Sequence, residues 1–243
     1  GGLDSAGGLF HASGLSRSAF TLAEVLITLG VIGIVAALTL PALIQTNKNA
    51  EVEAKLKKVY SVMNQAILMS ENENGPKEYW EPCTSNDCYN YYEKYLLPYL
   101  VSLKSVELST LSYYNIAIYF SDGSLLIGKN DTSGRVDYWF FPNAKNFNND
   151  SFGNWDASSA SVQRKGCGKT FFAFSFAPWD KSQRFHYKKG FETFKMNLSE
   201  VNEETLKQGL WGCKSTGNNP TYCTALIQLN GWKIPKDYPF KVK

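Results

Sequence analysis

Histidines and enzyme signatures are scarce in this sequence. Its two histidines are His11 and His186, and it contains neither a Gly-x-Ser-x-Gly elbow nor a His-Glu-x-x-His pair. The sequence therefore offers few candidate residues for a catalytic triad or for a histidine-based metal site. We expect His186, which lies between two aromatic residues, to be a structural strand residue. The sequence predicts that the protein is not an enzyme and uses no cofactor.

Nucleotide and calcium signatures are incomplete. Gly166–Thr170 ends in Gly-Lys-Thr like a P-loop, but Gln163 stands where the first glycine of that motif belongs. The residues that follow alternate like a strand, whereas a P-loop leads into a helix whose N-terminus holds the phosphate. We therefore expect no ATP site. We expect no calcium site either, because the candidate acidic ligands are scattered along the chain. They are Asp131, Asp150, Asp156 and Asp180.

Cysteine is absent from the first third of the chain. The five cysteines are Cys83, Cys88, Cys167, Cys213 and Cys223, a distribution that fits export of the later part into an oxidising compartment. The spacings make 83 with 88 and 213 with 223 the simplest disulfides, although sequence alone does not fix the connectivity. A zinc site would need thiol pairs about two to four residues apart, so we do not expect one.

Charge is absent from a long stretch near the N-terminus. From Val25 to Ile44 there is no charged side chain for 20 residues, the length that a helix needs to cross the hydrocarbon core of a bilayer. Glu24 stands directly in front of this run, although an acidic group within a membrane is unfavourable.

Three interpretations of this segment compete. It is a secretory signal peptide cut after Ala37, an uncut signal anchor, or a segment cut between Ala19 and Phe20. Only the third gives Glu24 a partner, because the cut frees the amine of Phe20. In a helical assembly, Glu24 of one subunit would neutralise that amine in its neighbour.

The sequence Phe-Thr-Leu-Ala-Glu, followed by the uncharged run, resembles the prepilin cleavage and methylation motif of type IV pilins and type II secretion pseudopilins. The resemblance implies that a prepilin peptidase cuts between Ala19 and Phe20 and methylates the new amine. Thr21 and Leu22 would be the next residues of its recognition motif. Glu24 would direct docking of the subunit into a growing filament. The family usually has Gly before the cut, where this chain has Ala19.

Gly33 and Pro41 also match the family at their distances from the cut. Pro41 lacks an N–H group, so a helix kink is implied there. The resemblance divides the chain into a leader (1–19), a transmembrane or filament-core helix (20–44) and a globular domain outside the cytoplasm (45–243).

The pattern after Pro41 is amphipathic. Apolar residues recur at steps of three and four, which predicts one long helix from about residue 20 to 70 whose second half packs under a sheet. Gly75-Pro76 should end it. The apolar stripe consists of Val52, Leu56, Val59, Met63 and Ile67.

The rest of the chain predicts an antiparallel sheet with short helices. Expected strands are 115–120, 125–127, 136–141, 170–176 and 185–196. Expected helices are 89–97 and one that Ser199 caps and that runs to Gly209, and 143–161 should be a surface loop. The fold class is α+β, a long N-terminal helix packed on an antiparallel β-sheet, as the resemblance to pilins implies.

Basic and aromatic residues mix between residues 164 and 195. Such a surface suits DNA, but the alternation favours a solvated strand face over core aromatics. The candidate nucleic-acid residues are Arg164, Lys165, Lys169, Arg184, Lys188 and Lys189.

We therefore expect a structural prepilin or pseudopilin of a type IV pilus or type II secretion pseudopilus. Its partners would be other subunits, the prepilin peptidase and an inner-membrane assembly platform. The precursor would span the inner membrane once, before entering a periplasmic or cell-surface filament. One alternative is a DNA-uptake or adhesive minor pilin that uses residues 164–195. Another is a secreted soluble protein of unknown activity, cut after Ala37.

Overall fold

A computed structural model describes residues 20–83, 88–102, 104–108, 114–130, 135–147, 166–196, 198–217 and 219–243. Several residues of the sequence predictions lie outside these ranges, as does most of the predicted loop at 143–161. They are Ala19, Asp131, Asp150, Asp156, Arg164 and Lys165. The chain divides into two units, residues 1–44 and 45–243, which are treated separately below.

The predicted long helix is confirmed. Helix α1 runs from Leu22 to Asn74 and is continuous past Gly33 and Pro41, and a kink at those residues stays a prediction. Gly75 follows with a φ of 75°, the left-handed conformation that commonly ends helices and that glycine adopts without strain.

The second half of α1 packs through the stripe that the sequence predicted. Leu56 and Met63 are fully buried, and the other stripe residues are almost fully buried. This burial stabilises the packing of the helix on the sheet, because each such side chain contributes about 1.5 to 3 kcal/mol when it is fully buried.

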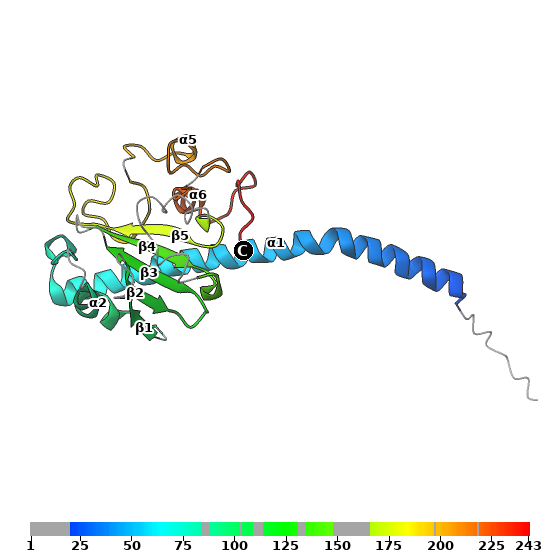
Figure 1. The fold of residues 1–243 in the computed structure, drawn as a ribbon, viewed down its shortest axis with the longest axis horizontal. Helices are drawn as coiled ribbons and strands as arrows, with labels where there is room; N and C mark the ends of the chain where they lie inside the picture. Colours follow the sequence, from blue (N-terminus) through cyan, green and yellow to red (C-terminus); the bar gives the residue numbers. More distant parts are fainter. Residues whose placement is uncertain are drawn as a thin grey trace, which may run out of the picture. The chain divides into compact units, whose positions relative to one another are not determined.

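The described strands form a six-stranded antiparallel sheet in which each strand pairs with the next one in sequence (Figure 1). The turn at Asp122–Ser124 joins two of them, as predicted for the hairpin. The strands are β1 (Lys104–Glu107), β2 (Tyr114–Tyr119), β3 (Leu125–Asn130), β4 (Val136–Phe141), β5 (Phe172–Phe176) and β6 (Glu192–Thr193).

Both faces of the sheet are covered. Ile116, Ile118 and Leu126 share a core cluster with α1, whereas Ala117 and Ile127 point the other way and share a second cluster with two later helices. Strand β4 is buried along its whole length as a result. The helices are α2 (Tyr89–Tyr95), α5 (Glu203–Lys207) and α6 (Cys223–Leu229), with 3-10 turns at Lys77–Tyr79, Leu97–Tyr99 and Ala144–Asn146.

Three sequence predictions about these elements need correction. The strand expected at 185–196 shrinks to Glu192–Thr193, so His186 lies in a turn and not in a strand, although it is buried. Helix α5 is capped by Asn202, not Ser199, because Asn202 and Thr205 bond each other reciprocally as a capping box. It also ends at Lys207, two residues before the predicted Gly209.

The two simplest cysteine pairings are confirmed within the described residues. Cys83 is bonded to Cys88 and Cys213 to Cys223, with Cα atoms 5.3 and 4.6 Å apart. Cys167 is buried and belongs to neither disulfide.

Candidate functional site

The first turn of α1 is closed by a capping box. The backbone N–H and the hydroxyl of Thr21 both donate to Oε2 of Glu24, each at 2.8 Å. The N–H of Glu24 donates back to the Thr21 hydroxyl at 3.2 Å. Glu24 therefore has a local role in starting the helix, in addition to the predicted role in docking. The Thr-x-x-Glu spacing is the sequence signal for this cap, and it overlaps the pattern that predicted docking.

The uncharged part of α1 exposes its apolar side chains. The exposed residues include Leu26, Ile32 and Leu38, which lie on different sides of the helix. The hydroxyls of Thr28 and Thr39 donate to backbone carbonyls one turn earlier, each at 2.9 Å, so they have partners within the helix. Among the described helices, α1 alone is long and apolar enough to cross a membrane.

The described basic residues of the candidate DNA surface do not form one groove. Lys181, Arg184, Lys188 and Lys189 gather in one turn and are exposed. Lys169 instead places its amine over the ring of Phe240, 4.5 Å from the centroid. Arg164 and Lys165 lie outside the described residues.

The aromatic ring nearest these cations is already covered. The amines of Lys189 and Lys195 lie 4.0 and 4.5 Å from the centroid of the Phe185 ring. Lys195 is itself buried, donates to Gln228 at 2.6 Å, and has a pKa lowered by that burial. A nucleic-acid base would have to displace an amine to stack on Phe185, which makes this surface a poor stacking platform.

His186 is packed beneath the same turn. Burial, and then the positive charge of Lys195, lower its pKa from 6.5 to about 3, so it is neutral in the folded protein. Its Nε2 accepts a hydrogen bond from the backbone N–H of Lys195 at 3.4 Å. These contacts give His186 a structural role.

The residues that resembled part of a P-loop form a closed turn before β5. The N–H groups of Lys169 and Thr170 both donate to the carbonyl of Gly166, at 3.0 and 2.9 Å, and that of Gly168 donates to Phe171 at 2.8 Å. Backbone donors used in this way are not available to a phosphate. Within the described ranges, no group of three or more His, Cys, Asp or Glu side chains is arranged to hold a metal ion.

Residues 230–243, here called the C-terminal strap, tie several elements together. Glu53 of α1 accepts the N–H of Ile234 at 2.9 Å and the amine of Lys233 at 2.7 Å. The side chain of Gln45 donates to the carbonyl of Val242 at 3.3 Å. On the other side of the sheet, the hydroxyl of Tyr238 donates to Gly168 at 2.7 Å.

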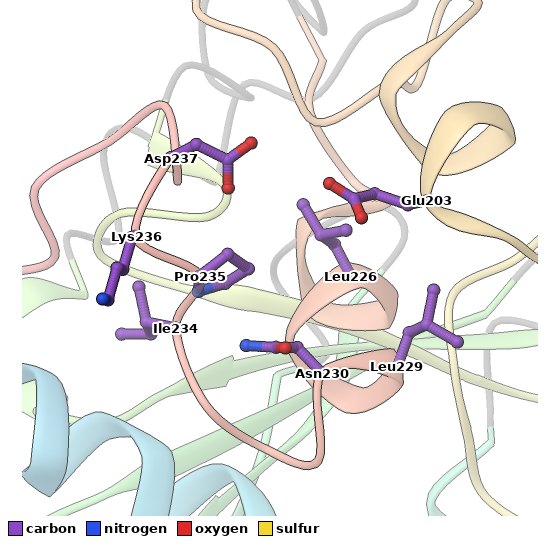
Figure 2. Close-up of a pocket in the computed structure, with 8 residues that line it drawn as sticks. All are labelled: Glu203, Leu226, Leu229, Asn230, Ile234, Pro235, Lys236 and Asp237. Atoms are coloured by element: carbon purple, nitrogen blue, oxygen red, sulfur yellow. The ribbon is translucent and has the colours of Figure 1, made fainter.

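The strap forms one wall of a pocket of about 550 Å³ (Figure 2). Leu226, Leu229 and Pro235 give it an apolar lining, and the side chain of Asn230 projects into it. The remaining lining residues are Glu203, Ile234, Lys236 and Asp237. No sequence pattern predicted this pocket.

An ionic bridge closes one side of the pocket mouth. The amine of Lys207 lies 2.5 Å from a carboxylate oxygen of Glu203 and 2.6 Å from one of Asp237. The two carboxylates come from α5 and from the strap, so the bridge joins opposite walls. Two carboxylates share this one amine, and Lys236 contributes a second amine to the lining.

The fold and the exposed helix define an α+β protein that is membrane-anchored or secreted, with a long N-terminal apolar helix and two described disulfides. The chain belongs to the family described as "Family of unknown function (DUF6613)", whose model matches residues 42–242. No curated protein and no solved structure matches it. The match begins directly after Pro41, so it covers the globular domain and only the last three residues of the uncharged run.

Proposed function

We propose that the protein is a prepilin-like structural subunit of a type IV pilus or a type II secretion pseudopilus. The observation that supports this most directly is the division of α1. Residues 25–44 are uncharged and largely exposed and directly follow the Phe20–Glu24 pattern, whereas the second half of α1 buries an apolar stripe under the sheet. Filament assembly through such a helix, with the domain turned outward, requires no catalytic site.

Processing would precede assembly. A prepilin peptidase would cut between Ala19 and Phe20 and methylate the new amine, while the precursor spans the inner membrane with its domain outside the cytoplasm. The disulfides support that orientation, because they persist in oxidising compartments. Other subunits and an inner-membrane assembly platform would then take up the mature chain.

The capping box leaves Glu24 able to act in docking. Both Thr21 donors reach the same oxygen, Oε2. The other oxygen, Oε1, is therefore available to accept the amine of Phe20 from a neighbouring subunit. One carboxylate can therefore cap its own helix and also neutralise the Phe20 amine of the neighbouring subunit.

The processing step is tested by mass spectrometry of the mature N-terminus. We expect a chain that starts at Phe20 with a methylated amine. A mature chain that starts at Leu38 would instead identify a secreted soluble protein and would end the proposal.

Docking is tested by comparing Glu24→Gln with Glu24→Ala in membranes and in sheared filaments. Glutamine can still accept the Thr21 hydrogen bonds, whereas alanine cannot. If docking depends on the charge, both variants are cleaved normally and both are lost from filaments. Incorporation of Glu24→Gln at the wild-type level would show that Glu24 acts only as a cap.

A further inference from the structure

A turn of the domain carries a cluster of exposed cations. Residues 180–190, here called the basic loop, contain four exposed basic side chains and one acidic residue, Asp180. Within the described residues, none of the four forms an ion pair. They are Lys181, Arg184, Lys188 and Lys189.

The pocket beside the strap has the complementary character. Two carboxylates, from Glu203 and Asp237, face its mouth with Lys207 between them, while the side chain of Lys236 points away (Figure 2). Glu204 adds another exposed carboxylate on the same helix. The rim therefore carries three carboxylates and two amines, and beneath it Leu229, Ile234 and Pro235 contribute apolar surface. An apolar side chain flanked by cations would match both features.

The basic loop supplies such a side chain. Tyr187 is partly exposed and lies next to Lys188, whose amine is 5.6 Å from the centroid of the Tyr187 ring. Tyrosine is a common anchor in interface pockets because its ring is large and rigid. The pocket, at about 550 Å³, has room for it.

The two surfaces lie at different levels along the second half of α1. The segment after the basic loop is held to the helix at Asn64, which exchanges two hydrogen bonds with the backbone of Phe191. The pocket wall is held at Glu53 through Ile234. These anchor points are about 16 Å apart along the helix axis, and Figure 1 places the loop and the strap toward different ends of the sheet.

We propose that the basic loop of one copy docks into the strap pocket of a second copy, with Tyr187 in the apolar floor and Lys188 and Lys189 against Glu203 and Asp237. Because the two surfaces differ and are offset along the axis, the contact is head-to-tail. A contact of this kind does not close as a two-fold dimer but adds further copies, into a ring or an open helical array; the filament of the proposed function corresponds to the open array. The inference deepens the proposed function by naming the surfaces through which domains meet in the filament.

Engineered cysteines test the contact in membranes that contain the full-length chain. A chain with both Lys188→Cys and Asn230→Cys carries each half of the contact, because the side chain of Asn230 projects into the pocket. Mild oxidation should therefore give a ladder of dimers, trimers and larger species on a non-reducing gel. The matched control combines Lys188→Cys with Lys57→Cys, an exposed lysine on α1. It should give no species above the wild-type background.

Charge reversal then tests the chemistry. In the crosslinking chain, Lys189→Glu or Glu203→Lys alone should reduce the ladder about tenfold, because each places like charges together. The two changes combined should restore most of it. Restoration also shows that the single variants are folded.

The outcomes separate this inference from the proposed function. A ladder that is absent, stops at dimers or is equal in the control overturns the docking contact, even where the wild-type chain is found in filaments. A ladder that survives in a chain whose N-terminus is not Phe20 keeps the contact and ends the pilin proposal. Loss on single reversal without rescue by the double reversal also overturns the contact.

Discussion

Glu53 provides the sharpest test of how the strap is held to α1. Its side chain is 12% exposed and accepts two hydrogen bonds, one from the backbone N–H of Ile234 and one from the amine of Lys233. The two bonds differ in kind. The first satisfies a backbone donor, and the second is an ion pair with a lysine whose side chain is 71% exposed.

The magnitudes predict an unequal effect of two substitutions. Glu53→Gln keeps an acceptor for the Ile234 N–H and loses the ion pair, which is worth less than about 1 kcal/mol at such an exposed lysine. Glu53→Ala loses both bonds and leaves the Ile234 N–H without its charged acceptor, at about 1.5 to 3 kcal/mol. We therefore expect the alanine variant to be clearly the less stable of the two.

Thermal unfolding of the full-length chain in detergent measures the difference. In a domain of this size, a loss of about 2 kcal/mol lowers Tm by about 4 to 8 °C, and the glutamine variant should lose less than half as much. Glu51→Ala is the matched control, because it removes a carboxylate of the same helix that is 60% exposed and does not contact the strap. If glutamine and alanine are equally destabilising, the ion pair dominates and this reasoning is wrong.

Three further predictions concern the domain core. Because His186 binds its proton at about pH 3 when folded and at about 6.5 when unfolded, stability should fall as pH drops below 6.5, by up to about 1.4 kcal/mol per pH unit. Urea unfolding at a series of pH values from 7 to 4 should show that the free energy of unfolding falls less steeply with pH in His186→Gln than in the wild type. An equally steep fall would refute this. Replacing Cys213 and Cys223 together with alanine removes a cross-link ten residues apart and should cost about 2 to 3 kcal/mol in calorimetry, whereas no loss of stability would contradict it. Gly128→Ala would push a methyl group into the buried hydroxyl of Tyr92, which should cost about 1 to 3 kcal/mol in the same assay, and a neutral result would mean that the ring moves freely.

The elements with long periodic patterns were predictable from the sequence. The stripe from Val52 to Ile67 predicted the second half of α1, and short apolar and aromatic runs next to a turn predicted the central strands. Strand β1 was missed because its four residues, Lys104–Glu107, are polar or exposed and show no alternation. Helix α6 was missed because seven residues are too few for a helical period, and Cys223 suggested a loop.

The candidate sites also differ in whether a local sequence pattern predicts them. The start of α1 could be read from a local motif, and Phe20–Glu24 carried both the docking prediction and an overlooked capping box. The strap pocket could not be predicted from the sequence, because its walls come from three separate segments, α5, α6 and the strap. Those walls are far apart in the sequence and meet only in the folded domain. Tertiary structure, not local pattern, also separates Lys169 from the basic loop.

The order of the strands has a consequence for how the domain folds as it leaves a membrane. Every described strand pairs with its neighbour in sequence, so the sheet grows by local steps, which are the fast ones. The strap contacts are the opposite case, since they join Glu53 to Ile234 and Gln45 to Val242 across 181 and 197 positions. In a chain that emerges N-terminus first, the sheet would be complete before the strap has emerged. At that stage α1 would pack on the sheet but would lack its contacts with the strap. The strap pocket would therefore form last. The contact proposed for that pocket would then be available only to domains that have finished folding.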